Sequence, residues 1–168
     1  IGISNYEAQR TAEITKIFKE LKTPFIIHQP RYNMFDRWIE DGLTDVLEEE
    51  GLGAIVFSPL AQGLLTDRYL DGIPEDSRAH RSEIQFLNEE NVEGTLSIVR
   101  ELNEIAQKRG QSLAQMAIAW NQQQKAVISV LVGASKLSQL ENNIKALDNL
   151  EFTADELAAI DRILAKKK

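Results

Sequence analysis

Four short apolar runs alternate with longer segments of helical periodicity, and this alternation restricts the fold more than any other feature. Strands are predicted at residues 1–3, 25–27, 54–57 and 127–132; helices are predicted at 8–21, 36–50, 92–109 and 112–120, from beyond 135 to about 147, and at 154–164. A chain that alternates strands with helices pairs its strands in parallel. The order therefore predicts an α/β fold with a parallel sheet.

Capping signals set the predicted ends of the helices. Capping boxes are expected at Ser4 with Glu7, at Ser138 with Glu141 and at Thr153 with Glu156, since each pair has the spacing that satisfies two free N–H groups. Asp36 is expected to cap the second helix, and Gly51 and Gly110 are expected to end the helices before them. Residues 60–91 show no clear period, and a loop of this length is usually functional or disordered.

Small or polar residues follow every predicted strand. They collect at the carboxyl ends of the strands, which form the working face of either an open α/β sheet or a (β/α)8 barrel. A full barrel takes about 250 residues, whereas this chain has 168. We expect a single domain that supplies about half of such a barrel.

The fourth strand and the helix after it make the clearest candidate for a binding site. The run Val127–Val130 continues with two further apolar residues, which is typical of a strand buried on both faces. Gly133 permits a turn, and Ser135 and Lys136 lie at the start of a helix, where N–H groups and the helix dipole attract anions. Two interpretations remain open here: a phosphate site, or an ordinary strand-to-helix turn with an exposed lysine.

The composition excludes several classes of function. A net charge of −7 argues against binding to nucleic acid or to anionic membranes. There is no cysteine, and the two histidines, His28 and His80, are far apart, so we expect no metal site. No apolar run is long enough to span a membrane and no signal peptide is visible, so a cytoplasmic location is expected. The chain opens on Ile1 inside a predicted strand, which suggests a fragment.

Read together, the strand ends resemble the carboxyl-terminal half of the aldo-keto reductases, most of all the bacterial branch similar to potassium-channel β subunits and glyceraldehyde-phosphate reductases. The matching motifs are Gly-Ile-Ser-Asn-Tyr at 2–6, His-Gln-Pro-x-Tyr-Asn at 28–33, Phe-Ser-Pro-Leu-Ala-Gln-Gly-Leu-Leu at 57–65, and Val-Gly-Ala-Ser-Lys at 132–136 followed by Gln139 and Asn143. The resemblance covers essentially the whole chain and implies a (β/α)8 barrel, with residues 1–168 forming its second, cofactor-binding half.

The resemblance implies that the chain binds NADPH. Ser4, Asn5 and Gln29 match positions that bind the nicotinamide carboxamide, and amide side chains can both donate and accept; Ser4 as a helix cap and Gln29 as a strand-end residue are the structural alternatives. Phe57 matches the aromatic residue that stacks on the nicotinamide, where many relatives have Tyr. The loop around the pyrophosphate corresponds to Ser58, Pro59, Leu60, Gln62, Gly63 and Arg68. The adenosine and its 2′-phosphate correspond to Gly133, Ser135, Lys136, Gln139, Asn142 and Asn143, with Asn142 standing where many relatives have Glu.

The resemblance also implies what this chain lacks. The family's catalytic Asp, Tyr, Lys and His are carried by the first four strands, so no catalytic residue is assigned here, and Tyr6, Tyr32, Tyr69 and His28 are not given those roles. His28 is expected to be a structural residue at a strand end. The whole protein would then reduce aldehydes or ketones to alcohols by hydride transfer, with the catalytic residues in an amino-terminal half.

Two other functions remain open. The chain could be a regulatory module that binds NADPH without turnover, similar to channel β subunits. It could also be a phosphate-binding barrel half that binds no nicotinamide, although the Ser4, Asn5, Gln29 and Phe57 set argues against this. A half barrel leaves two open strand edges, so we expect either a complementary half barrel or self-association.

Overall fold

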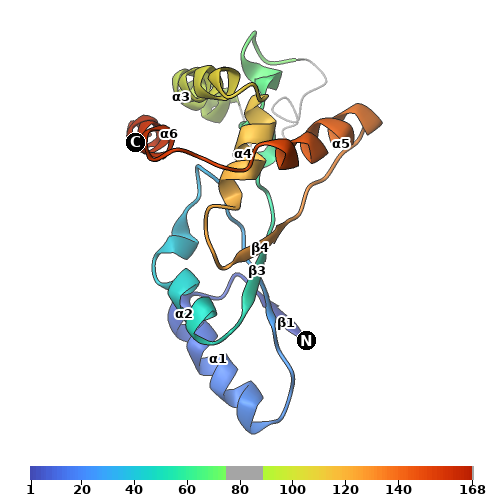
Figure 1. Ribbon diagram of the computed structural model, residues 1–168, viewed down its shortest axis with the longest axis vertical. Coiled ribbons are helices and arrows are strands. Elements are labelled where there is room, and N and C mark those ends of the chain that lie inside the picture. The colour runs from blue at the N-terminus through green and yellow to red at the C-terminus, as the bar shows by residue number, and fades with distance from the viewer. Residues whose placement is uncertain (75–88, 168) are drawn as a thin grey trace. The chain divides into compact units, whose positions relative to one another are not determined.

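The computed structural model describes residues 1–74 and 89–167, and its chain divides into two compact units (Figure 1). The first unit comprises Ile1–Pro59 and Trp120–Ser135, and the second comprises Leu60–Ala119 and Lys136–Lys168. Most of the predicted long loop, with His80, lies outside the described residues. The two units are treated separately below.

A parallel four-stranded sheet forms the centre of the first unit. Its strands are β1 (Gly2–Ser4), β2 (Ile27–Gln29), β3 (Gly53–Val56) and β4 (Val127–Val130), in that spatial order. Ile3 pairs with His28, His28 with Ala54, and Val56 with Val130. The predicted parallel sheet is therefore confirmed, although β2 begins two residues later than the apolar run suggested.

Two helices of the first unit, α1 (Ala8–Glu20) and α2 (Leu43–Glu49), pack against each other (Figure 1). The capping box predicted at Ser4 and Glu7 is wrong. Ser4 belongs to β1 and its hydroxyl donates a hydrogen bond of 2.7 Å to the Gln29 carbonyl, while Glu7 holds the N-cap position without a side-chain bond. The start of α1 is thus set by the end of the neighbouring strand rather than by its own cap.

The helix predicted over residues 36–50 is also wrong in its first half. Asp36 does not cap it, because its carboxylate pairs with Arg31 at 2.5 Å and its backbone closes a short turn with Asn33. A single 3-10 turn follows at Trp38–Glu40, and α2 begins only after Gly42. Gly42 has φ +79°, a left-handed conformation that suits glycine and interrupts the helical path.

The strand β4 is less covered than its sequence predicts. Val127 is buried, but Ile128 is 59% exposed, and Leu131 and Val132 just beyond the strand are also exposed. The prediction of a strand buried on both faces is therefore wrong for the described residues. The physical reason is that β4 is an edge strand here, paired only with β3. The core of this unit instead gathers Tyr32, Met34, Ile39, Leu43, Leu47, Ala54 and Val56.

The second unit is helical. It contains the 3-10 turns η2 (Ala61–Gly63) and η3 (Asp67–Tyr69), the helices α3 (Glu89–Lys108), α5 (Leu137–Ile144) and α6 (Ala154–Leu164), and the turn η5 (Lys145–Asp148). It also contains most of α4 (Leu113–Asn121), whose last two residues belong to the first unit. These helices agree with the predicted ones apart from their ends, with α3 starting three residues early. Helices α3 and α6 lie side by side (Figure 1), and the predicted inward face of α4 is buried at Leu113, Met116, Ala117 and Trp120.

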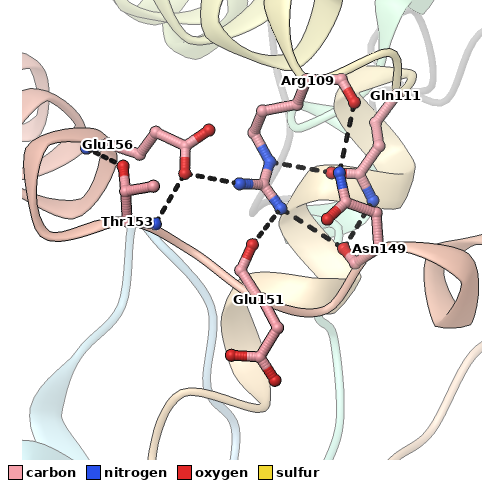
Figure 2. A network of polar contacts seen from close by, with 6 residues as sticks. All are labelled: Arg109, Gln111, Asn149, Glu151, Thr153 and Glu156. Carbon is pink, nitrogen blue, oxygen red and sulfur yellow. Dashed lines mark hydrogen bonds and ion pairs between the residues drawn. The ribbon is translucent and has the colours of Figure 1, made fainter.

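A polar network centred on Arg109 joins the elements of the second unit (Figure 2). The guanidinium donates to the Gln111 side chain at 2.9 Å, to the Glu151 carbonyl at 2.9 Å, and pairs with Glu156 at 2.8 Å. It also lies 3.6 Å from the centre of the Phe152 ring. Its side chain is only 3% exposed. Through these contacts, the arginine connects the end of α3 to the segment that precedes α6.

The predicted capping box of α6 is confirmed within the same network. The Thr153 hydroxyl accepts from the Glu156 N–H at 3.2 Å, and the Glu156 carboxylate accepts from the Thr153 N–H at 2.7 Å (Figure 2). Partial burial alone would raise the pKa of Glu156, but the hydrogen bonds from Thr153 and the ion pair with Arg109 outweigh it, and the pKa is lowered.

Candidate functional site

The residues proposed to bind a cofactor fall into both units. Those of the first unit are Ser4, Asn5, Gln29, Phe57, Ser58, Pro59, Gly133 and Ser135; those of the second are Leu60, Gln62, Gly63, Arg68, Lys136, Gln139, Asn142 and Asn143. Within each unit, the structure brings several of them together.

The carboxyl ends of β1 and β2 are joined through predicted site residues. The Ser4 hydroxyl donates to the Gln29 carbonyl, and the Asn5 side-chain oxygen accepts the Arg31 N–H at 2.9 Å. Asn5 itself has φ +55°, in the left-handed region that non-glycine residues rarely occupy. The arrangement leaves the Asn5 amide nitrogen as a donor and the Ser4 oxygen as an acceptor at the same strand edge.

The end of β3 continues this edge. The Phe57 N–H donates to the Pro30 carbonyl at 3.1 Å, and the Phe57 carbonyl accepts from Tyr32 at 3.2 Å. Ser58, with φ +57°, is also left-handed, and its carbonyl accepts a 3.0 Å bond from the Asn33 side chain. Asn33 is 3% exposed. It was part of the sequence motif but was not predicted as a site residue; only its place after a buried strand hinted at a role in holding this turn.

His28 is buried, as expected for a structural residue at a strand end. Its Nε2 lies 3.2 Å from the Tyr6 nitrogen and 3.0 Å from the Tyr6 carbonyl oxygen. Its Nδ1 is buried and has no hydrogen-bond partner among the described residues. Burial lowers the pKa of His28, which favours a neutral ring.

In the second unit, the loop that contains Leu60, Gln62 and Gly63 has an unusual backbone. Ala61, Gln62 and Gly63 have φ values of +46°, +61° and +102°. The Thr66 hydroxyl donates to the Gly63 carbonyl at 2.7 Å and accepts from the Arg68 N–H at 3.2 Å. The Gly63 N–H donates to the Leu60 carbonyl at 2.8 Å and the Leu64 N–H to the Ala61 carbonyl at 3.2 Å, so the turn is held by its own backbone.

The start of α5 is capped differently from the prediction. Lys136 is the N-cap residue, and the Gln139 side chain accepts its N–H at 3.2 Å. The capping box predicted at Ser138 and Glu141 is wrong, because Ser138 already lies inside the first turn of the helix. Lys136 is exposed, and its ammonium forms no ion pair with a described residue.

The neighbouring asparagines of α5 have different environments. The Asn142 side chain is engaged by α4, since its oxygen accepts from Gln115 at 2.8 Å and its nitrogen donates to the Ser112 hydroxyl at 3.1 Å. Asn143 is only 7% exposed, and its side chain makes no hydrogen bond with the described residues. Because the Asn142 amide is already engaged and the Asn143 amide is not bonded to a described residue, Asn143 is the better candidate of the two for a ligand contact.

The described residues hold no group of three or more His, Cys, Asp or Glu side chains that could bind a metal ion. Within residues 1–74 and 89–167, no helix is long and apolar enough to cross a membrane. For binding a ligand, the candidate residues provide hydroxyl, amide and backbone groups, together with one lysine and one arginine.

The sequence of this chain is similar to that of known oxidoreductases and channel subunits. Residues 1–165 match the sequence profile of the aldo/keto reductase family. The chain is 50% identical to an L-glyceraldehyde 3-phosphate reductase of Escherichia coli O157:H7, over 98% of this chain and 49% of that protein. It is 39% identical to a probable voltage-gated potassium channel subunit beta of Oryza sativa subsp. japonica, over 98% of this chain and 51% of that protein.

A solved structure shows the same relation. The glycerol dehydrogenase of Gluconobacter oxydans superimposes with a TM-score of 0.79 at 30% identity, covering 99% of this chain and 49% of the enzyme. Its fold is a (β/α)8 barrel, and this chain, with its parallel sheet, corresponds to about half of it. The chain spans about half the length of the curated relatives it matches. With a family match over almost its entire length, the chain belongs to the aldo/keto reductase family.

Proposed function

We propose that this chain binds NADPH as part of an oxidoreductase that reduces aldehydes or ketones to alcohols. The observation that carries the proposal is where the strained backbone lies. Of the five non-glycine residues with positive φ in the described ranges, Asn5, Ser58, Ala61 and Gln62 fall in the candidate segments, and the fifth, Lys22, follows α1. Each such residue costs about 1–3 kcal/mol, and strain of this kind clusters at ligand sites.

Each group of candidate residues would bind one part of the cofactor. Ser4, Asn5 and Gln29 would bind the nicotinamide carboxamide, with the Phe57 ring against the nicotinamide face. Residues 58–63 and Arg68 would bind the pyrophosphate, through backbone N–H groups other than those of Gly63 and Arg68, which donate within the loop. Gly133, Ser135, Lys136 and Gln139 would bind the 2′-phosphate, and Asn143 the adenine. Asn142 would support the adenine site through its bonds to Ser112 and Gln115.

Bound NADPH would supply the hydride that reduces the carbonyl carbon. The residues of this chain would hold the nicotinamide in place and leave one of its faces to the substrate. No residue of this chain is assigned as the proton donor, so we propose that the donor lies outside residues 1–168. The carbonyl compound is a small molecule whose pocket would also draw on groups beyond this chain.

A second candidate function is a regulatory module that binds NADPH with negligible turnover. The identity of 39% to a probable potassium channel subunit beta favours it. Both functions predict cofactor binding, and they differ in whether the whole protein reduces an aldehyde such as nitrobenzaldehyde.

Binding of NADPH and NADH to the 168-residue chain tests the proposal, with NADPH fluorescence and calorimetry as readouts. We expect NADPH to bind more tightly than NADH, and Lys136→Met to weaken NADPH by about tenfold while leaving NADH unchanged. The matched control is Lys145→Met, at the other end of α5, which should change neither. Equal affinity for the two cofactors in every variant, or a site that prefers inorganic phosphate, would contradict NADPH binding. Reduction of nitrobenzaldehyde by this chain alone would contradict the placement of the proton donor outside it.

A further inference from the structure

Three consecutive residues at the end of β1, namely Ser4, Asn5 and Tyr6, are each bonded to the end of β2. The Ser4 hydroxyl donates to the Gln29 carbonyl at 2.7 Å, the Asn5 oxygen accepts the Arg31 N–H at 2.9 Å, and the Tyr6 backbone lies within 3.2 Å of His28 Nε2. The first two bonds use side chains that belong to the candidate nicotinamide site. The third involves only the backbone of Tyr6, and its partner is the fully buried His28 ring.

The hydrogen-bonding groups around His28 favour one tautomer. Helix α1 begins at Ala8, so the Tyr6 N–H lies before the helix, and His28 Nε2 is its partner among the described residues. The Tyr6 carbonyl has a second donor, since the Thr11 hydroxyl reaches it at 3.3 Å. With the proton on Nδ1, Nε2 accepts from the Tyr6 N–H, and the Nδ1–H group alone is left unpaired. With the proton on Nε2, the ring donates to the Tyr6 carbonyl at 3.0 Å, and both the Tyr6 N–H and Nδ1 are left unpaired.

The contact between His28 and Tyr6 influences which hydrogen-bond donor and acceptor the turn at residues 4–6 presents to a ligand. Asn5 has φ +55° and lies between Ser4 and Tyr6, which are both hydrogen-bonded to β2. Its side-chain oxygen already accepts the Arg31 N–H. Its amide nitrogen therefore remains as the donor, and the Ser4 oxygen, whose proton goes to Gln29, remains as the acceptor. A carboxamide group needs one of each, because it carries one carbonyl and one NH₂.

We infer that His28 is a positioning residue for the nicotinamide end of the cofactor: its Nε2 holds the Tyr6 backbone, which keeps Asn5 left-handed and the Ser4 and Asn5 side chains aimed at a carboxamide. This inference rests on the proposed function. It assigns His28 no contact with the cofactor and no part in proton transfer. A positioning role differs from a purely structural one because loss of His28 would weaken binding of the nicotinamide end of the cofactor and not of the adenosine end.

The test compares the 168-residue chain with its His28→Leu and His28→Gln variants, using NADPH and adenosine 2′,5′-bisphosphate, which lacks the nicotinamide. We expect His28→Leu to weaken NADPH by about tenfold and to leave the bisphosphate unchanged. His28→Gln should restore most of the NADPH affinity, because its amide oxygen can accept from Tyr6. The control is Thr15→Val, which removes a buried 2.7 Å bond to the Thr11 carbonyl in α1 and should change neither affinity.

Four outcomes would overturn the inference. His28→Leu could keep the wild-type NADPH affinity, or it could weaken both ligands equally, as a structural residue would. Imidazole ¹⁵N shifts of the unmutated chain give an independent check if the Leu variant does not fold, since a proton on Nε2 would refute the acceptor role. Failure of the wild-type chain to bind either ligand would refute the proposed function itself, together with this inference.

Discussion

Arg109 is the residue on which the second unit depends most. Its guanidinium reaches Gln111, the carbonyls of Asn149 and Glu151, and the carboxylate of Glu156 (Figure 2). Arginine suits this position because its planar group offers five donors in a fixed geometry. Removing the guanidinium would leave the Glu151 carbonyl and the partly exposed Glu156 carboxylate without this partner.

We predict that Arg109→Met lowers the free energy of unfolding by about 2 kcal/mol, because a buried guanidinium loses several hydrogen bonds while its ion-pair partner Glu156 is partly exposed. Arg109→Lys should cost somewhat less, because lysine keeps the charge but loses the forked contacts. Urea unfolding followed by circular dichroism measures both. The control, Lys166→Met, removes an exposed pair with Glu101 and should cost less than about 1 kcal/mol. A similar loss in all three variants would contradict the special role of Arg109.

At the same scale, sequence reasoning identified candidate positions better than their roles. Asn142 and Asn143 are adjacent and chemically identical, yet one is bonded to α4 and the other is buried without a described partner. No local pattern distinguishes them, because the partners of Asn142 lie some 30 positions away in the chain. The anchoring role of Asn33 was missed for the same reason.

At the scale of elements, helix ends were predictable where the capping groups are local. The box at Thr153 and Glu156 formed as expected, since both bonds are made within one turn. Ser4 and Asp36 fit the same rules but formed bonds to Gln29 and Arg31 instead. At Ser4 a tertiary partner overrode the local preference, and a single sequence does not reveal such partners. At Asp36 the competing partner, Arg31, is local, since it lies five positions away.

We predict that Thr153→Ala lowers the free energy of unfolding by about 1 kcal/mol, the usual cost of losing an N-cap. Ser138→Ala is the matched comparison, because the same motif at Ser138 does not cap α5. It should be neutral or stabilising by about 0.5 kcal/mol, since alanine is the better helix former inside a turn. Thermal unfolding of the two variants measures both changes. A larger loss of stability for Ser138→Ala than for Thr153→Ala would contradict the assignment of Thr153, and not Ser138, as a helix cap.

At the scale of the whole molecule, the sequence predicted parallel pairing and half of a barrel, because both follow from the order and number of strands. The covering of β4 was not predictable in the same way. Its residues have the composition of a doubly buried strand, but Ile128 and Leu131 are exposed in the described sheet. Composition indicates that a strand is suited to burial, whereas burial itself needs a neighbour.

We predict that the 168-residue chain self-associates unless a complementary half barrel is supplied, since β1 and β4 are edges of the described sheet. Light scattering across a concentration series measures this, and Ile128→Lys should shift the distribution toward the monomer. Ile17→Lys, at an exposed position of α1, is the control and should leave the distribution unchanged. A monodisperse monomer at all concentrations would refute the prediction.

The exposed edge of β4 also has a consequence for handling the protein. The six residues Val127–Val130, Leu131 and Val132 carry no charge and no proline, and four of them are β-branched valine or isoleucine. Segments of this kind form the dry, interdigitated sheets of amyloid when they meet copies of themselves. Natural edge strands usually prevent this with a lysine or a proline. The same strand that suits the interior of a barrel is thus the part of this chain most prone to nucleate fibrils when it is left uncovered.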